Sequence, residues 1–172
     1  MPAPKNIAWL AANLQPLDDI LNCLLQFPAA FDINTAIGVQ LDTIGVIVGQ
    51  SRTVGFQPSG SVSPTLDDPT YRLLLRARIY QNHWTGKMDA LLNIWRNLFP
   101  GGTLIVNDHQ DMTVAIFVAG SFSSIIQDLI LNGYIIPRPQ GVLYTITMAT
   151  LPMLGFDRND AYVAGWDTGK YI

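Results

Sequence analysis

The sequence predicts an α+β fold: an N-terminal helical segment, a small α-β-β-α-β domain, and an extended aromatic C-terminal tail. Three observations support this prediction. Apolar residues recur at helical spacing in the first half of the chain, β-rich runs follow at 103–107, 112–118 and 142–147, and aromatic residues concentrate in 151–172.

A chain of 172 residues suits one or two small domains and can bury a substantial core. We divide it into N-terminal helices at 1–50, a loop at 51–66, the α+β domain at 67–150 and the tail at 151–172. The loop assignment rests on two prolines, two glycines and six Ser or Thr residues in 51–66, a composition that disfavours regular structure.

The first helix is predicted over 17–30. Asp18 and Asp19 lie in its first turn, where carboxylates interact favourably with the helix dipole, and Pro28 is expected to kink or end it. Cys23 follows Ile20 in the apolar pattern and is expected to be a small buried hydrophobic residue.

The second helix is predicted over 33–48, because apolar residues recur there at steps of four, four, three and four: Ile33, Ile37, Leu41, Ile44 and Val48. Gly38, Gly45 and Gly49 interrupt this pattern, and each glycine inside a helix costs roughly 1 kcal/mol relative to alanine. Two interpretations remain open. Either the helix is poorly formed and ends at Gly45, or a thin helix face is pressed against a partner, in which case Gly45→Leu should block assembly while the α+β domain still folds.

The α+β domain begins with helices predicted over 69–80 and 88–99. Asp67 or Asp68 caps the first of them, with Pro69 at the favoured first position. The β-rich runs 103–107 and 112–118 are joined by a short polar turn and predict a hairpin. A helical segment near 124–132 and a strand over 142–147 complete the domain, with the helices covering one face of the sheet.

The tail contains two Gly-aromatic-Asp units ten residues apart, centred on Phe156 and Trp166, and Tyr162 and Tyr171 add to its aromatic content. Two copies are too few to indicate a solenoid. The tail could cover this chain's own sheet, or its aromatic side chains could anchor a neighbouring subunit, since Tyr and Trp are enriched at interface cores.

The composition favours association with other proteins. Hydrophobic residues make up 49% of the chain and charged residues only 13%, about half the usual charged share of roughly 25%. The sequence contains no run of 18 apolar residues, so membrane insertion is not predicted. The net charge of −3 argues against nucleic acid as the main partner. The N-terminal residues do not resemble a signal peptide, so we expect assembly in the cytoplasm.

Catalysis is not predicted, because no nucleophile, metal-binding or phosphate-binding motif is present. His109 lies in the predicted hairpin turn and His83 at a helix end, where structural roles explain both. The basic residues Arg72, Arg76 and Arg78 are explained by ion pairs within the chain or between subunits rather than by phosphate binding. We therefore predict no catalytic residue, no cofactor and no metal.

Several short motifs together resemble a family of tail proteins from contractile-tailed bacteriophages, encoded beside the J-like baseplate wedge protein. The similar segments span roughly 30–150 and include Ala36-Ile37-Gly38, Leu41-Asp42-x-Ile44-Gly45, Gly49-x-x-Arg52 and Asp67-Asp68-x-x-Tyr71-Arg72, with Ile79, Asn82 and Gly86. The segment Arg138-Pro-Gln-Gly-Val142 also resembles the close of J-like and I-like wedge domains. One departure is Trp84-Thr85-Gly86-Lys87, where the family is expected to have a smaller polar residue followed by Gly-Thr.

The resemblance implies a structural role. The chain would be the smaller wedge subunit of a contractile-tail baseplate in the virion. Its N-terminal helices at 1–50 would be the bundle-forming part and would bundle with two copies of a J-like wedge protein. The chain would also contact other baseplate subunits and link the baseplate to tail fibres. The alternative is a tail-fibre adaptor or assembly chaperone that binds the fibre through the aromatic tail. The residues expected at partner interfaces are Ile37, Gly38, Leu41, Ile44, Gly45, Gly49, Arg52, Tyr71, Arg72, Phe156, Tyr162, Trp166 and Tyr171.

Overall fold

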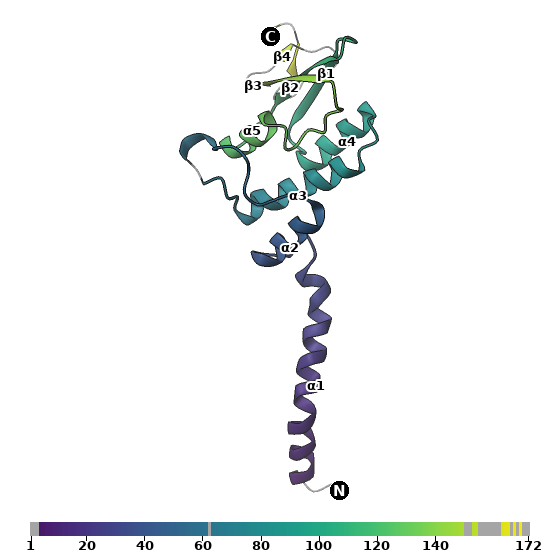
Figure 1. Cartoon of the computed structure of the whole chain (residues 1–172), viewed down its shortest axis with the longest axis vertical. Coiled ribbons are helices and arrows are strands. Elements are labelled where there is room, and N and C mark those ends of the chain that lie inside the picture. The colour runs from purple at the N-terminus through teal and green to yellow at the C-terminus, as the bar shows by residue number, and fades with distance from the viewer. Residues whose placement is uncertain are drawn as a thin grey trace.

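The predicted α+β class is confirmed in a computed structural model that describes residues 4–61, 63–149, 153–154, 163–165, 167 and 169. A single long helix, α1, extends away from a compact body, and α2 lies where the two meet (Figure 1). The elements in chain order are α1 (Pro4–Ala30), α2 (Val39–Val48), η1 (Ser59–Ser61), α3 (Asp68–His83), α4 (Met88–Leu98), β1 (Thr103–Asp108), β2 (Thr113–Ala119), α5 (Ser124–Leu131), β3 (Leu143–Ala149), β4 (Met153–Leu154) and β5 (Val163–Ala164).

Helix α1 is longer than the sequence pattern indicated. The prediction that it begins at Leu17 was wrong, because the helix starts at Pro4, contains Pro16 and Pro28, and has 27 residues. At 1.5 Å per residue it is about 40 Å long. Pro16 lacks an N–H and leaves one carbonyl of the preceding turn unpaired. Every side chain from 5 to 29 is exposed, so water can bond to that carbonyl and the helix continues.

Helix α2 is shorter than predicted and begins at Val39 rather than Ile33. Arg72 of α3 holds the preceding turn in place, since its Nε donates to the Ile33 carbonyl at 2.8 Å and its Nη2 to the Ala36 carbonyl at 2.6 Å. Gly38 occupies the N-cap position of α2 with a φ of 52°, a backbone conformation that favours glycine. The helix does not end at Gly45, because it continues to Val48 and ends with left-handed Gly49.

The sheet has the order β1-β2-β3 and matches the predicted strands to within two residues at each end. Strands β1 and β2 form the expected antiparallel hairpin, with Asp108 opposite Val114. Strand β3 pairs in parallel with β2, with Ile116 opposite Ile146. A parallel pair requires a crossover connection, and α5 lies in it.

One hydrophobic core joins the sheet to the helices. Helices α4 and α5 lie on the same side of the sheet (Figure 1), and alternating β2 residues Val114, Ile116 and Val118 are buried. Leu41 of α2 and Leu74 of α3 belong to the same core and are 0% exposed. Among α1 to α5 in the described chain, only α1 contributes no buried residue to this core.

Little of the tail lies within the described residues. Met153–Leu154 and Val163–Ala164 pair as two short parallel strands, and Ala164 is buried. The predicted aromatic anchors Phe156, Tyr162, Trp166 and Tyr171 lie outside the described residues. None of the helices searched in the described chain has the length and apolar character needed to span a bilayer.

Candidate protein interface

A row of apolar side chains runs along α1 with the spacing of a coiled-coil seam. Its members are separated by three, four, three, four and three residues, a mean period close to 3.5. Each is between 49% and 62% exposed. We call this row the α1 stripe; it consists of Ile7, Leu10, Leu14, Leu17, Leu21 and Leu24.

The apolar surface of α1 is wider than the stripe. Trp9, Ile20 and Phe27 flank one side and Leu25 the other, and all are more than half exposed. At 100° per residue, the apolar positions cover roughly 160° of the helix circumference, more than a two-stranded seam needs. The residues flanking a two-stranded seam are usually charged, whereas Ile20, Leu25 and Phe27 occupy such positions here. The surface therefore fits more than one neighbouring helix.

The opposite face of α1 is polar and includes Gln15, Asp19 and Gln26. Cys23 also lies away from the stripe and is exposed, so the expectation that it is buried was wrong. The reason is geometric: a burial pattern read from the sequence presumes a core beneath the helix, and none of this chain's core lies under α1.

Helix α2 adds a second exposed apolar surface at the body end of α1 (Figure 1). Val39, Val46 and Ile47 are 79%, 83% and 80% exposed, and Ile37 in the preceding turn is 64% exposed. The other side of α2 is packed into the body through Leu41 and Gly45. Val39, Val46 and Ile47 were not among the predicted interface residues, although their spacing of seven and eight residues places them on one helix face.

The close backbone approach that the α2 glycines predicted occurs within the chain. A Cβ atom added at Gly45 would overlap the Tyr71 hydroxyl and lie 2.8 Å from the Gln50 carbonyl oxygen. Tyr71 is 1% exposed and donates its hydroxyl to that same carbonyl at 2.7 Å. The absence of a side chain at Gly45 therefore allows Tyr71 of α3 to pack directly against α2. This contact holds α2 against the body.

Arg52 completes this junction. Its Nε contacts Asp42 at 2.5 Å, its Nη1 contacts Asp68 at 2.6 Å, and its Nη2 donates to the Gly38 carbonyl at 3.1 Å. Its guanidinium carbon also lies 4.6 Å from the centroid of the Tyr71 ring. We call this set of contacts the Arg52 clasp; it joins α2, the segment after it and the start of α3.

Asp68 serves the Arg52 clasp with both carboxylate oxygens. The Gly38 N–H donates to Oδ2 at 2.8 Å, and this bond, followed by the bond from Arg52, lowers the pKa of Asp68 below its ordinary value of 3.8. Of the two predicted capping residues, Asp67 occupies the cap position, and its carbonyl accepts from the Tyr71 N–H at 2.8 Å.

Asp68→Asn is expected to lower the melting temperature at pH 7. The amide carries no charge to pair with Arg52, and it has only one oxygen to accept the bonds from Gly38 and Arg52. A carboxylate with a lowered folded-state pKa stabilises the fold above its unfolded pKa and loses that effect as the pH falls through the folded value. The difference between wild type and Asp68→Asn should therefore be largest at neutral pH and shrink below about pH 4. Thermal melts from pH 7 to pH 3 measure it, with exposed Asp67→Asn as the control. A difference that stays constant with pH would contradict this role for Asp68.

The predicted interface residues thus divide into two groups. Leu41, Gly45 and Tyr71 are buried within the chain, Ile44 is partly buried, and Arg52 and Arg72 bond to neighbouring segments, so their part in a partner interface stays a prediction. Ile37, Gly38 and Gly49 are exposed. The residues of the α1 stripe were not among the predicted interface residues, although their three-four spacing is visible in the sequence.

No catalytic arrangement is evident at this surface. Among the residues that the structure describes, no group of three or more His, Cys, Asp or Glu side chains is arranged to hold a metal ion. His109 lies in the β1–β2 turn, where its N–H donates to the Thr113 carbonyl at 3.2 Å. His83 is the last residue of α3, as the sequence predicted.

An isolated helix with an apolar stripe, attached to a small folded body, is typical of a subunit of a larger protein assembly. The comparison with known families specifies the assembly. The chain belongs to the bacteriophage baseplate wedge 1 protein family, whose sequence profile matches residues 1–63 and 55–146. A search of curated proteins found no match. The protein is therefore a structural component of a phage baseplate, located in the virion tail and associated with other baseplate subunits.

Proposed function

We propose that this chain is the smaller subunit of the wedge in a contractile-tail baseplate, and that α1 bundles with helices of two copies of a J-like wedge protein. The observation that carries the proposal is the α1 stripe, an apolar row that extends over about 26 Å of a helix about 40 Å long and has no cover from the described chain. Membership in the wedge family supplies the assembly in which such a row can be covered.

The stripe supports strong association. Full burial of a Leu or Ile side chain contributes about 1.5–3 kcal/mol, and roughly half of each stripe side chain is still exposed. Covering the six residues therefore contributes on the order of 5–9 kcal/mol before the entropic costs of association. The flanking residues Trp9, Ile20 and Phe27 would add to this sum where a second partner helix covers them.

The body would occupy the platform side of the wedge, and we propose that it links the baseplate to tail fibres. The resemblance to proteins encoded beside the J-like wedge protein supports this part, together with assembly in the host cytoplasm. The exposed α2 residues Val39, Val46 and Ile47 offer a surface next to the bundle that can stay in contact with the same partner.

Removal of residues 1–30 tests the proposal. We expect the truncated chain to fold, because α1 contributes no residue to the core, and to fail to co-purify with the J-like protein when the two are expressed together. Near-UV circular dichroism and thermal melting of the truncated chain establish the fold. A chain without 151–172 serves as the control and should still bind. Normal co-purification of the chain without 1–30 would overturn the proposal.

A further inference from the structure

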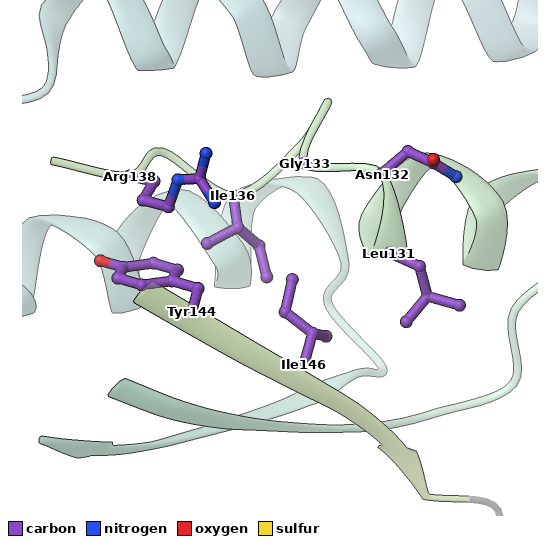
Figure 2. Close-up of a pocket in the computed structure, with 7 residues that line it drawn as sticks. All are labelled: Leu131, Asn132, Gly133, Ile136, Arg138, Tyr144 and Ile146. Carbon is purple, nitrogen blue, oxygen red and sulfur yellow. The ribbon is translucent and has the colours of Figure 1, made fainter. Parts of the chain in front are cut away.

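A groove on the body, away from α1, has the features of a second binding site. It consists of two adjoining hollows of about 340 Å³ and about 270 Å³, which share Gly133, Ile136 and Arg138. The larger hollow lies against the C-terminal half of α3, and the smaller against the end of α5 and strand β3 (Figure 2). Gln81 fixes the backbone between them, because its Nε2 donates to the Tyr134 carbonyl at 2.9 Å.

Two arginines of the groove have no carboxylate partner among the described residues. The Nε of Arg78 is buried and has no hydrogen-bond acceptor, and its Nη1 reaches Gln81 only at 3.4 Å. Arg138 is exposed, and the described chain gives it neither a hydrogen bond nor an ion pair. Both arginines line the larger hollow.

Arg52 and Arg72, two other arginines of the body, are satisfied by the chain itself. Arg52 contacts two carboxylates, and Arg72 donates to two backbone carbonyls. A buried N–H without an acceptor is costly, and few occur in native structures. Arg78 therefore places a guanidinium with an unsatisfied N–H and no carboxylate partner among the described residues in the wall of the larger hollow.

The smaller hollow has a mixed lining, in which apolar side chains lie beside the polar Asn132 and Arg138. Ile136 and Ile146 point into it, with the Tyr144 ring and Arg138 at one end and Leu131 at the other (Figure 2). Leu131 is 49% exposed although it ends an otherwise packed helix. The Tyr144 side chain is partly buried, which raises the pKa of its hydroxyl, whereas Arg138 is exposed.

We propose that this groove binds an extended segment of another baseplate subunit in which a carboxylate side chain lies next to an apolar one. The carboxylate would accept from the guanidinium groups of Arg138 and Arg78, which line the same hollow, since a guanidinium presents parallel N–H donors that match a carboxylate. The neighbouring apolar side chain would enter the hollow between Leu131 and Ile146. Charge complementarity selects this occupant over nucleic acid, because two cations on a chain of net charge −3 do not form a phosphate-binding surface.

The site is independent of α1, so it can be tested while bundle formation is intact. The chain is supplied in trans to a phage that lacks its gene, and plaque titre is measured. We expect Arg138→Glu to lower the titre about 100-fold, because it places a like charge against the incoming carboxylate. Arg138→Lys should lower it less, and Arg96→Glu is the matched control, since Arg96 is exposed on α4 and reaches only Asn93, at 3.5 Å.

Two further measurements distinguish the possible outcomes. Co-purification with the J-like protein and the melting temperature should be unchanged in Arg138→Glu, which separates this site from the α1 bundle and from misfolding. Phages selected to regain growth with Arg138→Glu should carry an Asp or Glu replaced by Lys or Arg in another baseplate protein. A titre equal to that of Arg96→Glu would overturn the proposal. Suppressors found only within this chain, or loss of DNA binding by the variant as its sole defect, would overturn it as well.

Discussion

Replacing both Leu14 and Leu21 with Asp is expected to abolish incorporation of the chain into the baseplate. The melting temperature of the isolated full chain should stay unchanged. Both side chains lie in the α1 stripe, 49% and 54% exposed, and neither contacts the body core. In a bundle, each carboxylate would replace an apolar contact with a charge that has no partner.

The expected loss is large. A truncated apolar anchor at an interface core costs about 2 kcal/mol or more, and an unpaired carboxylate adds to this. Two such sites give at least 4 kcal/mol, which corresponds to a roughly 1,000-fold weaker association. Surface plasmon resonance with the J-like protein measures the affinity, and complementation of a gene-deleted phage measures incorporation.

The control places the same two charges on the other face of the helix. Asn22→Asp with Gln26→Asp changes the net charge of α1 equally, and both residues are exposed outside the stripe. We expect this variant to assemble normally. If both double variants assembled equally well, the stripe would not be a contact surface, and the proposed bundle would lose its main support.

Much of the α+β body could be predicted from the sequence because its signals are local. The alternation at 142–147, the polar turn between the two preceding β-rich runs, and the Asp-Pro start of α3 each act over a few residues. The boundaries of α2 could not be predicted in this way. The turn that delays its start is held by Arg72, 39 residues away from Ile33, and no periodicity reports such a contact.

The sequence predicted association with other subunits and a bundle-forming segment at 1–50, but it did not predict which side chains of that segment are exposed. Low charge and high apolar content correctly indicated association with other subunits. The glycines of α2 were interpreted as evidence of a partner. Within the chain, however, Gly45 is explained by the close contact with Tyr71, and Gly49 by the left-handed backbone at the end of the helix. A single sequence cannot distinguish a close approach within the chain from one between chains, because the steric requirement for a missing Cβ is the same.

Gly45→Leu is expected to destabilise the body itself, rather than to block assembly while sparing the α+β fold. A side chain at this position must displace the Tyr71 hydroxyl and a backbone carbonyl at 2.8 Å, and backbone cannot move as readily as the end of a flexible side chain. Overpacking and the lost buried hydrogen bond together cost about 3–5 kcal/mol. For a chain of this size, this corresponds to a fall in melting temperature of about 10 °C.

A double-mutant cycle separates the two sources of this cost. Tyr71→Phe removes the hydroxyl that a Cβ at Gly45 would meet, so Gly45→Ala should be less destabilising in the Tyr71→Phe background than in wild type. Rescue should be incomplete, because the Gln50 carbonyl and the Tyr71 ring carbon Cζ still lie 2.8 and 2.9 Å from the added atom. Gly101→Ala is the control, since nothing lies within 4 Å of its added Cβ. If Gly45→Ala left the melting temperature unchanged and weakened only the association with the J-like protein, the glycine would serve an intersubunit contact, and Tyr71 would have to move away in the assembled wedge.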